Sequence, residues 1–252
     1  MPVVSERAGR DGRVLVIRLD RDAKLNAMDQ AMTLGLDAAM NRLEDDAELW
    51  AGVLTGNGRA FSAGSDLADP DRNHTERGGP YGLIRRERHK PLIAAVGGLA
   101  FGGGFEMVLA CDLVVASRSA RFALPEVKRG LLALYGGVFR GARALPLNLA
   151  REMVLTGEPI GAERAHTLGL VNRLCDDGAA LDAALELAEQ ICANSPVAVR
   201  ESLRVINRSI DASDEQAWQL SAEAAKVVRA SHDSREGIDA FLAKRAPRWT
   251  GH

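Results

Sequence analysis

Three consecutive glycines stand before a glutamate in the middle of the chain, and a second glutamate follows further on. Gly102, Gly103 and Gly104 precede a segment that can be helical, with Glu106 in its first turn, and Glu126 lies beyond an apolar, strand-like run. Glycine costs about 1 kcal/mol in a helix interior, so three together indicate a backbone that approaches another group or points its N–H groups at it. Accessible amides beside two carboxyl groups are suited to proton transfer next to a developing negative oxygen.

A second stretch of small residues, from Ala60 to Leu67, has a similar character. It is short for a helix, and it contains Gly64, although glycine is disfavoured in a strand. We therefore expect another accessible backbone at Gly64 and Ser65. A Gly-x-Ser-x-Gly motif surrounds neither Ser62 nor Ser65, which argues against a serine hydrolase.

Composition excludes several classes of protein. The chain has 252 residues, is 46% hydrophobic and has a net charge of -2, which allows a large core and gives no basic field for nucleic acid. The three cysteines and the histidines lack metal-ligand spacing, so no metal is expected, and free thiols favour a cytoplasmic location. No segment has the length or apolarity of a signal peptide or a membrane span.

Hydrophobic periodicity predicts alternating strands and helices up to about residue 175, followed by a helical tail. This divides the chain into a core over residues 1–194 and a helical region over residues 195–252. The helical region carries apolar stripes, which we expect to pack on the core and on another subunit. The predicted strands are Arg13–Leu19, Trp50–Thr55, Pro91–Val96, Cys111–Ala116 and Leu170–Leu174.

Three polar segments have ordinary structural interpretations. Residues 68–80 are polar, with prolines and glycines, and are expected to form a surface loop that could act as a lid. The basic residues within 84–90 are expected on a solvated helix face rather than at a phosphate. Capping boxes are predicted at Ser213–Gln216 and at Asp233–Glu236.

Taken together and in order, these motifs resemble the crotonase superfamily, also called the enoyl-CoA hydratase/isomerase family. The resemblance covers nearly the whole chain, and no single motif carries it. The matching segments are Lys24–Met28, Ala60–Leu67, Phe101–Glu106, Cys111–Asp112, Phe122–Glu126, Val154–Gly157, Gly169–Val171 and Phe241–Arg245.

The resemblance implies an α/β fold, a spiral of ββα units with a C-terminal helical oligomerisation region, assembled as a homotrimer or a dimer of trimers. It implies an acyl-CoA thioester as substrate, with coenzyme A part of the substrate and no separate cofactor. The backbone N–H groups of Ser65 and Gly103 would hold the thioester oxygen as an enolate. Glutamates at both Glu106 and Glu126 are similar to the pattern of the family's hydratases.

The resemblance also implies contacts to coenzyme A. Lys24 and Ala27 would lie near its adenine and phosphates, and Ala63 and Leu67 would flank the same groove. Phe241 and Lys244 match C-terminal positions that reach a coenzyme A, often that of a neighbouring subunit.

Two departures from the family pattern concern the substrate. Leu67 and Ala68 stand where hydratases often carry a lysine, which removes one expected phosphate contact. Leu134 and Tyr135 stand where small residues are usual, so their bulk would shorten the pocket, favour a branched or functionalised acyl group, or displace the water.

Three functions follow as hypotheses. The first is hydration of a trans-2-enoyl-CoA or the reverse dehydration, with Glu106 nearer the water and Glu126 nearer the proton transfer at C2. The second is isomerisation or thioester hydrolysis through the same enolate. The third is binding of a CoA thioester with little turnover.

Overall fold

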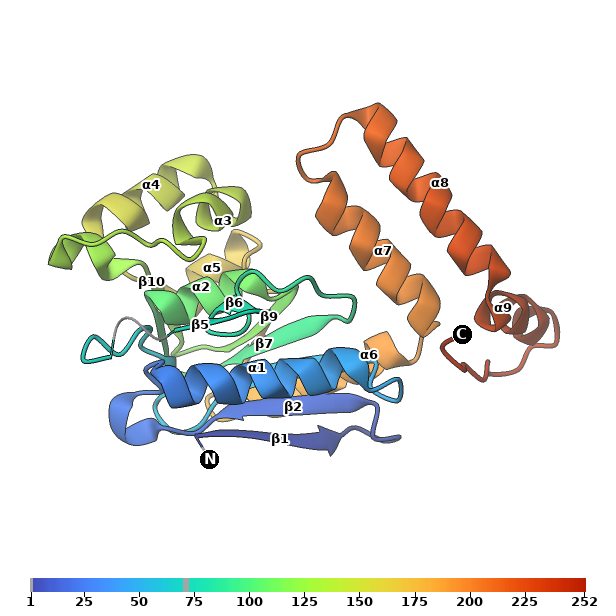
Figure 1. Cartoon of the computed structure of the whole chain (residues 1–252), viewed down its shortest axis with the longest axis horizontal. Coiled ribbons are helices and arrows are strands. Elements are labelled where there is room, and N and C mark those ends of the chain that lie inside the picture. The colour runs from blue at the N-terminus through green and yellow to red at the C-terminus, as the bar shows by residue number, and fades with distance from the viewer. Residues whose placement is uncertain (1, 70–72) are drawn as a thin grey trace.

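The computed structural model describes residues 2–69 and 73–252, and its main element is a six-stranded sheet (Figure 1). The strand order is β1-β2-β3-β7-β9-β12. Every neighbouring pair is parallel except β1 and β2, which form an antiparallel hairpin. The strands are β1 (Val3–Ala8), β2 (Val14–Leu19), β3 (Ala51–Gly56), β7 (Leu92–Val96), β9 (Leu113–Ser117) and β12 (Arg173–Cys175).

A second sheet of short strands, in the order β11-β10-β8-β4, repeats the connectivity of the first. Each of β3, β7 and β9 is followed along the chain by one short parallel strand, β4, β8 or β10. This repetition is the ββα spiral expected from the sequence. The short strands are β4 (Ala60–Ser62), β8 (Leu99–Phe101), β10 (Arg121–Ala123) and β11 (Ile160–Gly161).

Helices cover both sheets and enclose two apolar clusters. Helix α1 (Gln30–Asp45) begins where the Asp29 carboxylate accepts from the Met32 amide, at 2.8 Å, and its apolar stripe is buried in the larger cluster. Helix α6 (Ala180–Cys192) packs small residues on β3, β7 and β9. The other helices of this part are α2 (Gly103–Ala110), α3 (Gly137–Ala144), α4 (Leu147–Thr156), α5 (Ala162–Thr167) and the 3₁₀ turns η1 (Asp22–Lys24) and η2 (Pro125–Arg129).

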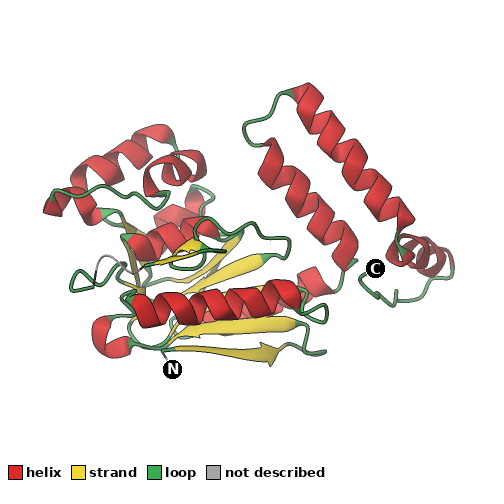
Figure 2. Ribbon diagram, in the orientation of Figure 1, coloured by secondary structure: helices red, strands yellow, loops and turns green. Residues whose placement is uncertain are grey.

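The chain ends in helices that stand beside the sheets rather than on them (Figure 1). Helices α7 (Pro196–Ser209) and α8 (Asp214–Ala230) pack on each other, and α9 (His232–Leu242) follows. No described residue after Cys175 lies in a strand, and Figure 2 shows the C-terminal part of the chain as red helices joined by loops. The boundary at residue 194 falls between α6 and α7 and stays a prediction.

One of the two predicted capping boxes is present and the other is not. Ser213 and Gln216 cap α8 reciprocally. The box predicted at Asp233 is wrong, because Ser231 caps α9 and accepts from the Ser234 amide at 3.1 Å. The Asp233 carboxylate instead accepts from the backbone of the C-terminal tail at residues 250–251.

Two further local expectations are corrected by the fold. The segment expected as a loop contains a small hairpin, β5 (His74–Thr75) and β6 (Gly79–Pro80), while the part at residues 70–72 lies outside the described residues. The basic cluster is not a solvated helix face. Arg86 is buried against Asp37, and Lys90 is buried against backbone carbonyl groups. The Arg88 side chain is only 9% exposed and pairs with Asp112. Within the described ranges, no helix has both the length and the apolarity needed to cross a membrane.

Candidate active site

The site forms where three short parallel strands end side by side. In the second sheet Ser62 pairs with Ala100 of β8, and Phe101 pairs with Ala123 of β10, so β4, β8 and β10 end on one line. The segments that follow them carry Ser65, Gly103 and Glu126, respectively. The register of the sheet therefore brings together residues that are far apart in the sequence.

Two backbone amides meet at this edge. The segment with Gly64 and Ser65 is held against Met28, whose amide donates to the Gly64 carbonyl at 2.7 Å and whose carbonyl accepts from the Asp66 amide at 2.9 Å. A Cβ added to Gly64 would lie 2.8 Å from the nitrogen of Gly103, so the two segments are in close contact. In the described part of the chain, no group accepts a hydrogen bond from the Ser65 or the Gly103 amide.

The glycine triplet has a steric origin at two of its positions. Helix α2 begins at Gly103 and lies so close to neighbouring segments that side chains are excluded. A Cβ at Gly103 would overlap the phenol of Tyr81, and one at Gly104 would overlap the carbonyl of Ser62. The free N–H groups of the first turn thus face the strand ends, where the helix dipole favours negative charge.

Glu106 projects from the first turn of α2 into the interior, where only 2% of its surface is exposed. Its Oε1 accepts from the Gly137 amide at the start of α3, at 2.9 Å. Burial, with the charge of Glu126 adding to it, raises the pKa of Glu106 to about 7 despite that hydrogen bond. A carboxyl group poised near neutrality exchanges protons readily in both directions.

Glu126 lies in the first turn of η2, close to the glycine triplet. Its Oε1 would be 3.2 Å from a Cβ added to Gly102. Its Oε2 is buried, with no hydrogen-bond partner among the described residues. Burial raises the pKa of Glu126 as well. Two acids of raised pKa close to accessible amides are suited to acid–base catalysis.

Tyr81, which the structure places at the centre of this group, was not predicted from the sequence. Its side chain is fully buried, its Oη lies 2.6 Å from Ser65 Oγ, and its ring packs edge-on against Tyr135 with centroids 5.1 Å apart. The local sequence Pro80-Tyr81-Gly82 is typical of an ordinary turn. The position of the ring depends on the preceding hairpin, which local patterns do not reveal.

The four positions predicted to contact coenzyme A near η1 are brought together by backbone pairing. The Ala63 amide donates to the Leu25 carbonyl at 2.9 Å, so the segment after η1 runs beside the segment after β4. Lys24, Ala63 and Leu67 are exposed there, and Ala27 is at the edge of the core. Their contacts with coenzyme A stay a prediction.

The remaining predicted binding residues divide into two groups. Leu134 is 71% exposed and Tyr135 is half-buried at the start of α3, next to the acids. Phe241 and Lys244 lie in or just after α9, across the molecule from η1, the short blue helix at the lower left of Figure 1. Phe241 is 83% exposed. Within one subunit these last two residues are therefore separated from the predicted catalytic residues.

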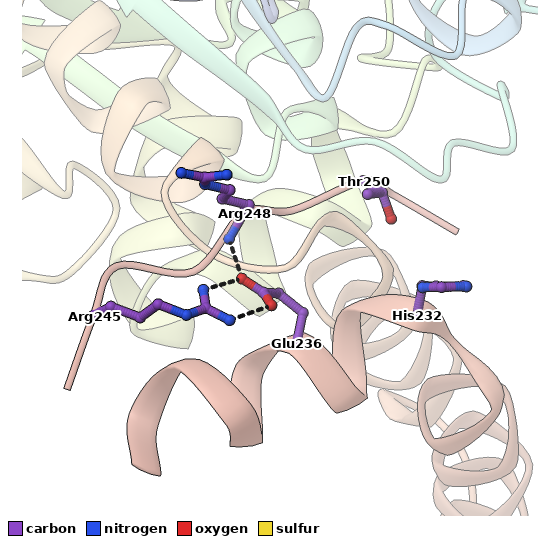
Figure 3. A pocket seen from close by; sticks show the side chains of 5 residues that line it. All are labelled: His232, Glu236, Arg245, Arg248 and Thr250. Atoms are coloured by element: carbon purple, nitrogen blue, oxygen red, sulfur yellow. Dashed lines mark hydrogen bonds and ion pairs between the residues drawn. The ribbon is translucent and has the colours of Figure 1, made fainter. Parts of the chain in front are cut away.

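A cavity of about 500 Å³ adjoins α9 (Figure 3). Glu236 binds the Arg245 guanidinium with both oxygens, at 2.6 and 2.8 Å, and accepts from the Arg248 amide at 2.6 Å. Because these bonds hold the C-terminal tail against α9, we interpret the polar groups of this cavity as stabilising the fold rather than binding a substrate. No cluster of metal-binding side chains occurs in the described residues.

Comparison with known proteins gives the same family over the full length. The family model of enoyl-CoA hydratase/isomerase matches residues 9–252. A carnitinyl-CoA dehydratase of Salmonella arizonae is 39% identical, with 98% of this chain and 99% of that protein covered. A short-chain-enoyl-CoA hydratase of Clostridium acetobutylicum is 33% identical over 94% of each chain. The crystal structure of an enoyl-CoA hydratase from Mycobacterium tuberculosis superposes with a TM-score of 0.93, at 45% identity, over 100% of this chain and 99% of that one. The chain therefore belongs to the enoyl-CoA hydratase/isomerase family.

Proposed function

We propose that the protein adds water to a trans-2-enoyl-CoA, or removes it from a 3-hydroxyacyl-CoA, with Glu106 and Glu126 as the acid–base pair. The observation that carries the proposal is that two acids of raised pKa lie near the Ser65 and Gly103 amides, which have no acceptor among the described residues. Membership of the family supports an enzyme of the hydro-lyase type, and the relatives include one named as a short-chain-enoyl-CoA hydratase and one named as a carnitinyl-CoA dehydratase.

In the hydration direction, the Ser65 and Gly103 amides donate to the thioester oxygen. The oxygen of water attacks C3 while Glu106 accepts a proton from that water. The electrons of the C2–C3 double bond move toward the thioester oxygen, which becomes an enolate held by the amides. Glu126 then delivers a proton to C2, and the proton taken from water restores the charge state of the pair. Dehydration follows the same steps in reverse.

The physical environment supports this sequence of steps. Amides fixed by the β-sheet need no reorganisation when negative charge develops, and loss of one such donor costs about 10²–10³ in rate in a related kind of site. A pair of carboxyl groups with raised pKa values keeps one proton available near neutral pH. The two carboxyl groups and the added water handle every proton in the scheme, and the amides stabilise the enolate oxygen, so we propose that coenzyme A enters only as part of the substrate.

We further propose that the enzyme works as a homotrimer or a dimer of trimers. Helices α7 to α9 present large apolar side chains to solvent, as expected of a surface that packs on another copy. Residues Ile206, Trp218, Ile238, Phe241 and Leu242 are between 60% and 83% exposed. Contact with a neighbouring subunit would also bring Phe241 and Lys244 to that subunit's coenzyme A. A cytoplasmic location stays a prediction from the cysteines.

A substrate panel tests the proposed reaction. Enoyl-CoA and 3-hydroxyacyl-CoA esters of graded length are scored for water addition and loss through the ultraviolet band of the conjugated thioester. The Glu126→Gln variant preserves shape and removes the acid, and it should lose about 10²–10⁴ in hydration rate. Unchanged hydration in this variant would contradict the proposal.

Controls separate the alternative reactions. A 3-enoyl-CoA tests for isomerisation, and release of free coenzyme A tests for hydrolysis. Tight binding of the thioesters without exchange of the C2 proton in deuterium oxide would instead indicate a binding protein.

A further inference from the structure

A pair of hydroxyl groups lies beside the two accessible amides and is not used in the mechanism above. Ser65 Oγ and Tyr81 Oη are 2.6 Å apart. Tyr81 is fully buried, whereas Ser65 is half-buried. The serine is therefore the member of the pair that a ligand can reach.

The phenol of Tyr81 is close to every predicted catalytic group. It packs against Gly103, where a Cβ would overlap the ring, and it bonds to Ser65. Burial and the nearby charges of Glu106 and Glu126 raise the pKa of the phenol, while the bond to Ser65 opposes that rise. Tyr81 thus remains protonated and available as a hydrogen-bond donor at neutral pH.

The backbone of Tyr81 is held in an unfavourable conformation to place this ring. Its φ is +55°, in the left-handed region, which is unusual for a bulky side chain and costs free energy. Its amide donates to the Asn73 carbonyl at 2.6 Å, and its ring is supported by the edge of Tyr135. Strain of this kind persists where the surrounding structure determines it, and it concentrates at functional sites.

Counting hydrogens shows that one donor remains. The pair has two hydroxyl hydrogens, and the bond between the oxygens uses one. Either oxygen could be the donor, and because a phenol is a stronger acid than an aliphatic alcohol, we infer that Tyr81 donates and Ser65 accepts. The hydrogen of Ser65 is then available, because no described residue other than Tyr81 bonds to its hydroxyl.

We propose that the Ser65 hydroxyl, oriented by Tyr81, donates a third hydrogen bond to the thioester oxygen of the substrate. This inference rests on the proposed function. Oγ and the amide nitrogen of Ser65 are separated only by Cα and Cβ, so both can reach one acceptor. Tyr81 is then a positioning residue, since it acts through the serine, and Ser65 contributes both its backbone and its side chain.

The third donor acts on the enolate more strongly than on the ground-state carbonyl, so its loss lowers kcat rather than raising KM. Ser65→Ala removes the hydroxyl and keeps the amide. Tyr81→Phe keeps the ring and removes the orienting bond. A hydrogen bond to a charged group supports a decrease in kcat of about ten- to one-hundred-fold for Ser65→Ala, with KM within a few-fold.

The test measures kcat and KM together with the polarisation of a bound thioester carbonyl. The probe is a cinnamoyl-CoA with an electron-donating para substituent, whose absorption band moves to longer wavelength when hydrogen bonds polarise the carbonyl. Wild type, Ser65→Ala, Tyr81→Phe and the double variant are compared. Thr55→Val is the matched control, because it also removes a buried hydroxyl, one that bonds the Ala95 carbonyl in the sheet at 3.0 Å.

We expect a smaller band shift in both single variants and no change in Thr55→Val. The double variant should have a kcat and a band shift no lower than those of Ser65→Ala. A full band shift in Ser65→Ala, or losses that multiply in the double variant, would overturn it while leaving the proposed function intact. If Tyr81→Phe does not fold, the band shift and kcat of Ser65→Ala still test the third hydrogen bond. A wild-type protein that neither shifts the probe nor hydrates any thioester would refute the proposed function as well.

Discussion

Replacing Glu106 by glutamine should make the protein more stable while it loses activity. The carboxyl group ionises near pH 4.5 in an exposed setting and near pH 7 in the fold. Between these values the folded chain binds more protons than the unfolded chain, so the free energy of unfolding decreases as pH rises through this window. Glutamine never ionises, and its amide oxygen can still accept from the Gly137 amide.

The size of the effect follows from the pKa. A change from 4.5 to about 7 corresponds, at about 1.4 kcal/mol per unit, to roughly 3 kcal/mol. Solvent screening reduces this free energy only slightly, because the Glu106 side chain is almost completely buried. We therefore expect Glu106→Gln to equal wild type near pH 4 and to exceed its unfolding free energy by about 3 kcal/mol at pH 8. Hydration should fall by about 10²–10⁴.

Denaturant unfolding at fixed protein concentration, repeated from pH 2 to pH 8, measures this difference and covers the range in which the control titrates. Glu236→Gln is a control of opposite sign. Arg245 and the Arg248 amide lower the pKa of Glu236 to about 2, so that variant should be less stable at neutral pH, with a deficit that disappears as pH falls toward 2. A stability difference between Glu106→Gln and wild type that does not vary with pH would refute the reasoning about the buried acid.

Three other predictions use different parts of the chain. Gly64→Ala adds a Cβ next to the Gly103 nitrogen at a position where φ is +93°, so activity should fall by about 10²–10³ with altered carbonyl polarisation; unchanged kcat would argue against the paired amides. Arg88→Ala leaves Asp112 buried without its guanidinium and should lower the unfolding free energy by about 3–5 kcal/mol, measured by denaturant titration; a loss below 1 kcal/mol would contradict this. Phe241→Ser should shift the mass measured by light scattering toward the monomer, and a trimer of unchanged stability would count against the proposed interface.

The family and the fold were predictable because their signals are local and repeated. Glycines 102–104 and Glu106 are adjacent in the sequence, and the comparisons confirm the predicted family. The structure also places Ser65, Gly103 and the two acids at one edge, although their catalytic roles stay predictions. The accessible backbone expected at Gly64 and at the glycine triplet was predictable because glycine is needed where neighbouring segments exclude a Cβ.

The predictions that were wrong concern residues whose partners come from distant elements. Arg86 and Arg88 lie in a charged run typical of a solvated face, yet Asp37 of α1 and Asp112 after α2 bury them as ion pairs. Asp233 was assigned a cap because spacing alone cannot show that the C-terminal tail returns to it. In each case, the sequence supplied the charged group and the tertiary structure determined its partner.

Several energetically unfavourable features lie together at the ends of β4, β8 and β10. The Ser65 and Gly103 amides have no acceptor in the described protein, Glu126 Oε2 has no partner, Glu106 is buried with a raised pKa, and Tyr81 has a positive φ. Each of these is unfavourable, and a scaffold selected for stability alone has no reason to collect them at one edge. In the mechanism we propose, an enoyl thioester with one water provides partners for the amides and the acids together, because its oxygen accepts from the amides and its C2 and the water exchange protons with the acids. This convergence on a single polar, charge-shifting substrate favours catalysis over a passive binding function.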